Sequence, residues 1–538
     1  MKAFPFQVHK PMTMTVHRIS PHGHMASPPC STNSSHSLTP ALSQTLSASQ
    51  NPRTIPAHKH QERKLASNED RVPPRDQSQK VKISGQIYGQ RKKILLSISS
   101  GKSVFFTGAA GTGKTNVLRH AVKILRRIHG DASVFVTAST GVAASALNGT
   151  TLQAFAGIGA GLDDVDSLVA RVKRNPQARS RWTKAKALVI DEISMINGDL
   201  FDKLSRVGKI IRGQSREFGG LQLVVAGDFC QLPPVHPPDP DKFFAFQADC
   251  WDNCFDVQIE LTSILRQTDL EFMNMLNEIR KGVCSPKSIR MLDRCRRPSL
   301  SNDADRDIAF TKLFPLKVEV VRENEEKLKE LGQEIVTFHA EDSGPEHARA
   351  QIEGTLAVKE LSLCVGAQVM LIYNLDTEKG LVNGKKGVVV GFESSDECNE
   401  ISPAGVWPVV RFPRCKPEMV KPQAFEFRGF DKDGRVVVTA KRVQVPLILA
   451  WALSVHKCQG MTLERIETDL TRAFEYGMVY VALSRLKALE GLRLMGFHPA
   501  KVRAHPKVLE FYQRLGQNRS VRTLDRWRKG DRRSDVGS

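Results

Sequence analysis

The sequence has no long hydrophobic run. Its longest apolar stretch, Val445–Val455, contains a proline and is much shorter than the ~20 residues of a membrane-spanning helix. This absence excludes a transmembrane protein. The chain has 538 residues, of which 41% are hydrophobic and 25% charged, which is sufficient for two or more folded domains.

The sequence also lacks a complete set of zinc-ligating residues. Ten cysteines are spread from Cys30 to Cys458, and Cys250 and Cys254 are close enough in sequence to share a metal ion. No second Cys or His pair at matching spacing follows them, so we expect reduced thiols and no zinc site.

Negative charge is scarce. Lysine and arginine total 78 against 57 acidic residues, which gives a formal net charge of +21. The first 61 residues and residues 511–538 each contribute five of these charges, so residues 62–510 retain +11. A basic body favours a polyanionic partner such as nucleic acid.

The first 61 residues contain no aspartate or glutamate. They are rich in serine, proline and threonine and hold seven of the fifteen histidines. This composition is typical of a transit peptide or a disordered leader, and we assign residues 1–80 to such a basic leader. It predicts a mitochondrial location, with the nucleus as the alternative. An untargeted flexible extension is the remaining interpretation.

Short apolar runs alternate with helical patterns in the first half of the chain. Each run is bounded by turn or polar residues, as expected for buried parallel strands. The sequence therefore predicts an α/β domain over residues 81–255. The predicted strands are Lys102–Phe106, Ser133–Ala138, Ala187–Ile190 and Leu221–Ala226, and the first predicted helices are Gln90–Ser100 and Asn116–Arg127.

The second half has α/β character interrupted by a β-rich segment. A helical pattern covers residues 264–279, Gly366–Phe412 is β-like with an Asn-Gly hairpin signal at 383–384, and α/β character returns at Leu447–Leu453 and Ala473–Leu483. The assigned ranges are 256–320 and 440–510 for a second α/β domain, 321–439 for an insertion and 511–538 for a basic, disordered tail.

One glycine-rich loop carries a strong chemical signal. It joins a predicted strand to a predicted helix, and its glycines let backbone N–H groups surround a phosphate. Lys114 can then reach the outer phosphates and Thr115 can hold magnesium. A structural glycine-rich turn is the weaker alternative. The loop residues are Gly108, Ala109, Ala110, Gly111, Thr112, Gly113, Lys114 and Thr115.

Polar side chains follow two further predicted strands. Asp191 and Glu192 end an apolar run, where Asp191 can hold the magnesium shell and Glu192 can polarise an attacking water. Gln231 lies just after the run that ends at Ala226, and its amide is placed to sense the γ-phosphate of a nucleotide. Solvated polar residues near strand ends are the alternative for all three.

Phosphoryl transfer also needs positive charge on the transition state, often an arginine from a second domain. Arg266 lies just past the first predicted α/β domain, and Arg485 lies near the end of the second. Position alone leaves an ordinary surface arginine as an equal alternative for each.

Nine motifs follow one another along the chain: Phe105–Thr115, Thr137–Gly141, Phe155–Gly159, Gly219–Leu223, Gly227–Pro234, Leu265–Gln267, Val382–Gly384, Ser454–Gly460 and Tyr480–Arg485. Together they resemble the ordered motifs of the PIF-family DNA helicases of superfamily one. The resemblance extends from about Gln90 to Leu494. There are three departures. Gln153 stands where the family usually has a histidine, Cys458 replaces a common serine, and the distance from Gln90 to Gly101 is one residue longer than in the family's pattern.

The resemblance implies an α/β fold with two RecA-like parallel-sheet motor domains. It adds a small wedge insertion near Thr150–Arg181 and a β-barrel-like (SH3-like) insertion in the second domain. It also implies ATP and Mg²⁺ as cofactors and movement 5′ to 3′ on single-stranded DNA.

The same resemblance implies roles for individual residues. Arg266 and Arg485 are assigned to the γ-phosphate, and Gln90 matches a nucleotide-binding glutamine ahead of the P-loop strand. The predicted catalytic residues are then Lys114, Asp191, Glu192, Gln231, Arg266 and Arg485. The residues assigned to the DNA strand are Thr137, Ser139, Thr140, Phe155, Ser454, His456 and Lys457, which include hydroxyl and basic groups suited to phosphates.

The leading hypothesis is an ATP-dependent DNA helicase in genome maintenance, acting as a monomer on single-stranded DNA and duplex junctions. The main alternative is a single-strand-binding scaffold whose ATPase is lost, which the complete set of predicted catalytic residues argues against. A P-loop kinase of small molecules would explain the P-loop but neither the second α/β domain nor the basic body.

Overall fold

A computed structural model describes residues 89–235, 239–263, 269–296, 308–344, 352, 356–394, 401–402, 405–430 and 436–517. All of these residues belong to one compact unit, which begins at Ser78. The predicted leader, Arg266 and residues 518–538 of the predicted tail lie outside the described residues.

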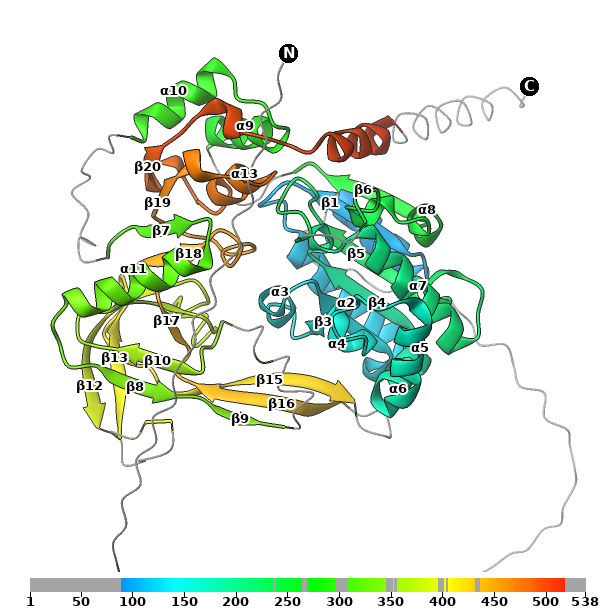
Figure 1. Ribbon diagram of the computed structural model, residues 1–538, viewed down its shortest axis with the longest axis horizontal. Helices are drawn as coiled ribbons and strands as arrows, with labels where there is room; N and C mark the ends of the chain where they lie inside the picture. The colour runs from blue at the N-terminus through cyan, green and yellow to red at the C-terminus, as the bar shows by residue number, and fades with distance from the viewer. Residues whose placement is uncertain are drawn as a thin grey trace, which may run out of the picture. The chain divides into compact units, whose positions relative to one another are not determined.

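The first half of the chain forms a six-stranded sheet in which every neighbouring pair is parallel (Figure 1). The strand order is β3-β2-β4-β5-β1-β6. The strands are β1 (Val104–Gly108), β2 (Val134–Ala138), β3 (Thr150–Thr151), β4 (Ala187–Asp191), β5 (Gln222–Gly227) and β6 (Val257–Leu261). The four strands predicted in this domain are confirmed.

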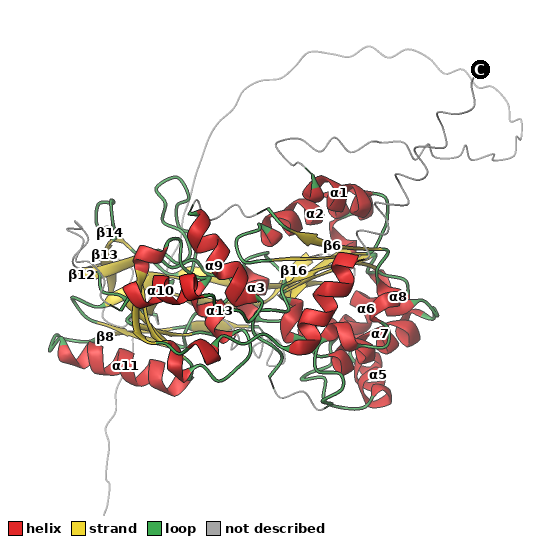
Figure 2. Cartoon of the chain, turned by 90° about the horizontal axis from the view of Figure 1, so that it is seen from above, coloured by secondary structure: helices red, strands yellow, loops and turns green. Residues whose placement is uncertain are grey.

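The helices around this sheet are α1 (Gln90–Ser99), α2 (Lys114–His129), α3 (Gly141–Ser145), α4 (Leu152–Ala156), α5 (Val165–Arg174), α6 (Pro176–Lys184), α7 (Gly198–Arg212) and α8 (Trp251–Cys254). Figure 2 shows α1 and α2 on one side of the sheet and α5, α6 and α7 on the other. Because side chains alternate along a strand, Val104 and Phe106 pack with α1 and α2, whereas Phe105 joins the cluster on the opposite face.

Strand β6 extends the first domain beyond the predicted boundary at residue 255. It pairs with β1 along its whole length, from Val257 beside Val104 to Leu261 beside Gly108. The assignment of residues 257–261 to the second α/β domain is therefore wrong. Strand β6 lies at the edge of the sheet and is only partly buried, so its sequence alternates apolar and polar residues and lacks the continuous apolar run of a central strand.

A second parallel sheet lies in the later part of the chain, with the order β18-β7-β19-β20. This confirms the second α/β domain, although the helix predicted from Ala473 begins only at Met478. The strands are β7 (Thr311–Phe314), β18 (Ala452–Ser454), β19 (Ile466–Asp469) and β20 (Leu492–Gly496), and the helices are α9 (Leu270–Arg280), α10 (Pro286–Arg294), α11 (Lys317–Glu330) and α13 (Met478–Leu483).

The insertion contains a five-stranded antiparallel sheet of order β14-β13-β12-β11-β17, a three-stranded sheet β15-β16-β9 and the pair β10-β8. It has its own apolar cluster, which includes Phe338 and Trp407. The strands are β8 (Val336–His339), β9 (Glu341–Ser343), β10 (Glu360–Leu363), β11 (Gln368–Leu371), β12 (Lys386–Ser394), β13 (Val406–Arg411), β14 (Glu418–Met419), β15 (Gln423–Phe430), β16 (Val436–Gln444) and β17 (Leu447–Leu449).

Both predicted boundaries of the insertion are displaced. Helix α11 packs on β7 and β18, so it belongs to the second α/β domain and the insertion begins after residue 330, not at 321. Strand β17 pairs with β11, so the insertion continues to Leu449, past the predicted end at residue 439. Strands β11 and β12 are antiparallel neighbours, but residues 372–385 connect them, so Asn383 and Gly384 form a turn within this connection and not a two-residue hairpin loop. Gly384 has φ 91° in this turn.

Residues 506–517 form a helix that corrects the predicted disordered tail. Phe511 and Leu515 are one turn apart and both are buried. The ring of Phe511 stacks on Phe246 at 4.5 Å and meets Phe229 edge-on at 5.4 Å, so the helix packs on the first domain. The prediction therefore placed the start of the basic tail, at residue 511, too early in the sequence.

Within the described ranges, none of the helices is both long enough and apolar enough to cross a membrane.

Candidate active site

The loop between β1 and α2 has a backbone that requires glycine. Gly111 and Gly113 have φ values of 83° and 81°, and a Cβ atom on Gly108 would lie 2.7 Å from the carbonyl oxygen of Leu261. No side chain caps the start of α2 at Lys114. The first N–H groups of this helix are therefore available to an anion such as a phosphate.

Lys114 is buried at the base of this loop. Its ammonium donates to the carbonyl oxygen of Gly108 at 2.8 Å. Burial lowers the pKa of Lys114, and the nearby acids Asp228, Glu192 and Asp191 oppose this effect. A phosphate at the loop would provide the ammonium with a stronger acceptor than a carbonyl oxygen.

Asp191 ends β4, as predicted, and is buried. Burial raises its pKa to about 7, and the neighbouring charge of Glu192 adds to the rise. A divalent cation would stabilise the charged carboxylate, and Thr115 and Asp191 supply the oxygen ligands that Mg²⁺ prefers. No group of three or more His, Cys, Asp or Glu side chains could hold a metal among the described residues. These two residues fit an ion that takes its other ligands from phosphates and water.

Glu192 connects the two parallel-sheet domains. Its backbone is left-handed, with φ 50°, and its Oε2 atom accepts a hydrogen bond of 3.2 Å from Nε2 of Gln459. Gln459 lies in the Ser454–Gly460 segment, and the family resemblance assigns Ser454, His456 and Lys457 of this segment to the DNA strand. A predicted water-activating residue and a predicted DNA-binding segment are thus in direct contact.

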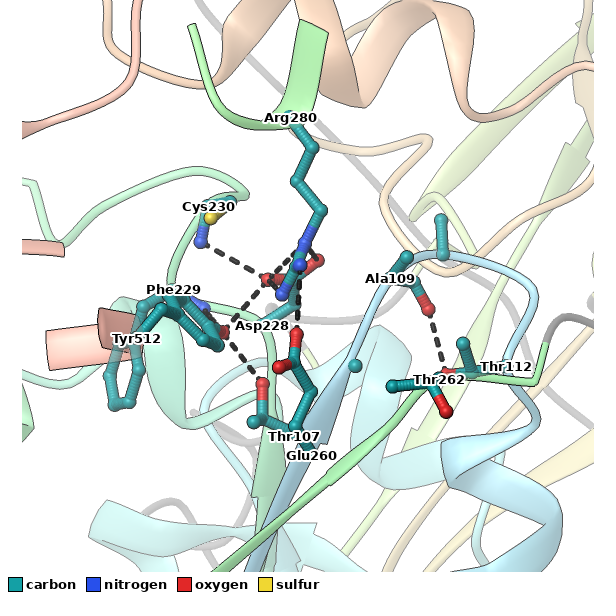
Figure 3. Close-up of polar contacts among 12 residues, drawn as sticks. Thr107, Ala109, Thr112, Asp228, Phe229, Cys230, Glu260, Thr262, Arg280 and Tyr512 are labelled. Carbon is teal, nitrogen blue, oxygen red and sulfur yellow. Dashed lines mark hydrogen bonds and ion pairs between the residues drawn. The ribbon is translucent and has the colours of Figure 1, made fainter. Parts of the chain in front are cut away.

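A fully buried carboxylate, Asp228, lies directly after β5 (Figure 3). Nη2 of Arg280 donates to its Oδ1 at 2.9 Å, and Nη1 of Arg280 donates to Oε1 of Glu260 at 3.1 Å. Burial alone would raise the pKa of Asp228, but Arg280 and Lys114 outweigh it and lower the pKa. The carboxylate is therefore ionised and paired.

Two tyrosines reach Asp228 from the second half of the chain. Tyr480 of α13 accepts a hydrogen bond of 2.7 Å from the P-loop N–H of Ala110 and lies 3.3 Å from Oδ2 of Asp228. Tyr512 of the C-terminal helix donates to Oδ1 at 3.0 Å. Sequence reasoning missed both tyrosines and Arg280. Tyr480 opens a motif that the sequence singled out, whereas Arg280 and Tyr512 have no local signal.

Gln231 lies in a tight turn beside the same carboxylate. Its backbone N–H donates to the carbonyl oxygen of Asp228 at 2.9 Å, and its side-chain Oε1 is buried without a hydrogen-bond partner among the described residues. A Cβ atom on Gly477 would lie 2.4 Å from the Cys230 carbonyl, so the segment before α13 supports this turn closely. This amide oxygen can accept a hydrogen bond from a water, whereas the predicted contact with the γ-phosphate needs the NH2 group of the same amide as the donor.

Of the two candidate arginines, only Arg485 lies among the described residues. Arg485 is buried and donates to the carbonyl oxygens of Val481 and Met461 and to Oγ of Ser484. All of these partners lie in its own domain, so its contact with the γ-phosphate stays a prediction. Arg266 lies outside the described residues, and its role also stays a prediction.

Gln90 starts α1 beside the edge strand β6. Its Nε2 donates to the carbonyl oxygen of Glu260 at 2.9 Å, and its Oε1 accepts from the N–H of Thr262 at 3.0 Å. The amide therefore holds α1 against the end of β6. Its predicted contact with the nucleotide is not tested by these bonds.

Two residues assigned to DNA have side chains in the protein core. Thr137 is buried and donates to the carbonyl oxygen of Val189 at 2.8 Å. The ring of Phe155 is buried 5.1 Å from Trp182. These side chains are inaccessible to a strand here, so the structure does not support the predicted contacts through them.

Ser139 and Thr140 follow β2 and lie closer to the surface. Thr140 caps α3 by accepting a hydrogen bond of 3.2 Å from the N–H of Ala143. Oγ of Ser139 is buried and has no hydrogen-bond partner in the part of the chain that is described. Their predicted DNA contacts stay predictions.

The second segment assigned to DNA contains a histidine beside an acidic residue and a lysine near another lysine. Oγ of Ser454 accepts from the N–H of Lys457 at 3.3 Å, and Nε2 of His456 lies 3.3 Å from Oε2 of Glu475. Burial, and then the charge of Lys317, lower the pKa of Lys457. A phosphate near Lys457 and Lys317 would stabilise the charged forms of these two lysines, which repel each other.

Family models match two parts of the chain. A PIF1-like helicase model matches residues 86–290, and a model of the DNA helicase Pif1 2B domain matches residues 353–392. A curated relative is the ATP-dependent DNA helicase PIF1 of Xenopus laevis, 42% identical over 433 residues that cover 80% of this chain and 65% of the relative. The chain thus spans about 65% of the length of the curated relatives it matches.

Solved structures show the same similarity. The crystal structure of Pif1 helicase from Candida albicans is 38% identical with a TM-score of 0.66, and the match covers 80% of this chain and 100% of that one. Pif1 helicase from Bacteroides in complex with ADP-AlF3 and single-stranded DNA is 29% identical, with a TM-score of 0.56 and 81% and 98% coverage. A structure of two coordinating Pif1 helicases at forked double-stranded DNA is 28% identical, with a TM-score of 0.54 and the same coverage.

The position of Lys114 generates a first prediction. We expect Lys114→Ala to lower the rate of ATP hydrolysis by ~10²–10³ because a preorganised positive group is lost from the phosphate site. Binding to single-stranded DNA should be largely unchanged. Lys123→Ala, an exposed lysine on the same helix, is the matched control. Turnover of Lys114→Ala at the wild-type rate would contradict the assignment of this loop.

Proposed function

Because this chain belongs to the PIF1-like helicase family, we propose that it acts as an ATP-dependent DNA helicase. It moves 5′ to 3′ on single-stranded DNA, unwinds duplex or structured DNA, and serves repair, recombination and replication. The relatives named above support this proposal, and so do the basic body and the two parallel-sheet domains of the chain.

The observation that carries the proposal is the hydrogen bond between Gln459 and Glu192. It joins the Ser454–Gly460 segment of the second domain to the acid predicted to polarise the attacking water. A strand that displaces this segment must also displace the partner of Glu192. Such a contact provides a physical route by which DNA binding alters hydrolysis, as a translocating motor requires.

A second bond gives the reverse coupling. The hydroxyl of Tyr480 accepts a hydrogen bond from the N–H of Ala110, which belongs to the proposed phosphate-binding loop. A bound phosphate needs the N–H groups of this loop. Nucleotide binding therefore competes with Tyr480 and shifts the balance of contacts between the P-loop and α13.

The chain's own residues account for the main needs of the reaction. Magnesium, when bound, neutralises charge on the phosphates. Thr115 and Asp191 would hold this ion, and Lys114 supplies further positive charge. Glu192 polarises the water. The unpartnered amide oxygen of Gln231 accepts a hydrogen bond from that water, and its amide NH2 group donates to the γ-phosphate.

The direction of movement tests the proposal. In the presence of ATP and Mg²⁺, a duplex with a 5′ single-stranded tail should be unwound and one with a 3′ tail should not, as followed by strand displacement. Single-stranded DNA should also raise ATP turnover. DNA binding without any turnover would instead support the scaffold alternative, and unwinding from the 3′ tail alone would contradict the direction.

Arg485 provides a second test, because its charge is needed mainly in the transition state. We expect Arg485→Ala to bind ATP nearly as well as wild type and to hydrolyse it ~10³–10⁵ times more slowly. The matched control is Arg493→Ala, a partly exposed arginine on β20 in the same domain.

Arg485 also has local structural contacts, so the melting temperature is measured on both arginine variants. Arg485→Lys keeps the charge while losing the planar guanidinium. A parallel loss of nucleotide affinity, turnover and melting temperature in Arg485→Ala would show a structural residue and overturn its assignment to the γ-phosphate.

We propose that the protein acts on single-stranded DNA and duplex junctions as a monomer. The predicted motor residues all lie in one chain, which supports this number. The related structure with two coordinating helicases at a fork makes a direct measurement useful. Sedimentation of the protein on forked DNA should give one copy per fork, and a stable pair would contradict the proposal.

We also propose that the protein is mitochondrial. The support is the acid-free composition of its first 61 residues, which lie outside the described part of the chain. A reporter fused to residues 1–61 should enter mitochondria. Accumulation in the nucleus or a diffuse signal would contradict this location.

A further inference from the structure

The hydroxyl of Tyr512 lies where two loops of the candidate active site begin (Figure 3). It lies 2.6 Å from Oγ1 of Thr107, 3.0 Å from Oδ1 of Asp228 and 3.2 Å from the backbone nitrogen of Phe229. Thr107 immediately precedes the P-loop, and Asp228 and Phe229 begin the turn that leads to Gln231. One hydroxyl thus bonds to both loops.

The three contacts use the full hydrogen-bonding capacity of this hydroxyl. An ionised carboxylate only accepts, so Tyr512 donates its single proton to Asp228. The N–H of Phe229 and the hydroxyl of Thr107 then donate to the two lone pairs of the tyrosine oxygen. Burial, and then the charge of Asp228, raise the pKa of Tyr512, which keeps the hydroxyl protonated as this arrangement requires.

The position of the hydroxyl is fixed by the packing of its helix. Phe511, the preceding residue, is buried among aromatic rings of the first domain. The guanidinium of Arg280 lies 4.6 Å from the centre of the Tyr512 ring. The ring is therefore held on one side by a cation while its hydroxyl bonds to the loops.

The turn held by Tyr512 determines where the side chain of Gln231 points. The turn is closed by the bond from the N–H of Gln231 to the carbonyl oxygen of Asp228. The N–H of Phe229 lies inside this turn and is bound by Tyr512. Loss of that bond would free the turn, and with it the buried amide oxygen of Gln231, relative to the P-loop.

We propose that Tyr512 is a positioning residue for ATP hydrolysis, which fixes the spacing between the P-loop and the turn that carries Gln231. The inference rests on the proposed function and deepens it. The hydroxyl of Tyr512 acts through its contacts with Thr107, Asp228 and Phe229, so it is a positioning residue and not a catalytic one. It also makes the C-terminal helix a working part of the first domain.

The test compares Tyr512→Phe with wild type in the full chain. Phenylalanine keeps the ring against Arg280 and the apolar packing, so only the hydroxyl is lost. We expect kcat for DNA-stimulated ATP hydrolysis to fall ~10–100-fold, because small misplacements of catalytic groups have effects of this size. The affinity for a non-hydrolysable ATP analogue should change less than about threefold by comparison.

Tyr373→Phe is the matched control. Tyr373 lies in the insertion, is partly exposed and has no hydroxyl hydrogen bond among the described residues. It should leave kcat, nucleotide affinity and melting temperature at their wild-type values. A kcat for Tyr512→Phe within about twofold of wild type would overturn the inference, as would equal losses in kcat, nucleotide affinity and melting temperature.

Hydrogen exchange tests the same bond without relying on turnover. In the nucleotide-free protein, Tyr512→Phe should speed amide exchange in peptides covering residues 227–234 and leave peptides around Tyr373 unchanged. Unchanged exchange at 227–234 would overturn the inference. If wild type itself shows no ATP turnover, the proposed function fails, while this measurement still decides whether Tyr512 holds the turn.

A double variant identifies the path of the effect. Thr107→Val removes the hydroxyl that donates to Tyr512 and preserves its shape. If both residues act through their shared bond, the double variant with Tyr512→Phe should lower kcat no more than the larger single effect. Multiplicative effects would contradict a shared role.

Discussion

The arrangement of the active site depends on how the protein accommodates one buried negative charge, that of Asp228. A carboxylate with no exposed surface is unstable unless it is paired and hydrogen-bonded. Arg280 supplies the opposite charge, and Tyr480 and Tyr512 add hydrogen bonds. Removing one partner from such a pair typically costs about 3–5 kcal/mol, because the other charge is left buried alone. The requirement to satisfy Asp228 therefore draws α9, α13 and the C-terminal helix to the end of β5.

This gathering of elements gives the phosphate site its second-domain contacts. Tyr480 bonds to Asp228 and to the P-loop N–H of Ala110, so the same side chain that satisfies the buried charge also occupies part of the phosphate site. The bond from Gln459 to Glu192 provides a separate connection to the segment assigned to DNA. Under the proposed function, nucleotide, DNA and domain contacts compete for a small number of hydrogen bonds, and this competition couples hydrolysis to movement.

The parts of the fold that could be predicted are those whose signals are contiguous in sequence. The strand and helix on either side of the P-loop appear as an apolar run, a glycine cluster and a helical pattern within about 25 residues. Edge strand β6 was not predicted because it is only partly buried, so its sequence lacks the continuous apolar run of a central strand. The insertion boundaries were displaced because α11 is assigned to a domain by packing on β18, which lies more than 100 residues later. Thr137 and Phe155 are a further example. Their motifs in the sequence indicated a DNA-binding segment, but the motifs do not show that these two side chains are buried.

By itself the sequence determined the phosphate-binding loop, the acidic pair Asp191-Glu192 and the presence of two α/β domains. Each depends on neighbouring residues: glycines that permit a positive φ, and carboxylates that end an apolar strand. Only the tertiary structure decided which distant groups complete the site. Arg280 and Tyr512 have unremarkable surroundings in the sequence, and their importance arises from being brought to Asp228, 52 and 284 positions away. A buried charge selects its partners by distance in space, and that information is absent from any local pattern of residues.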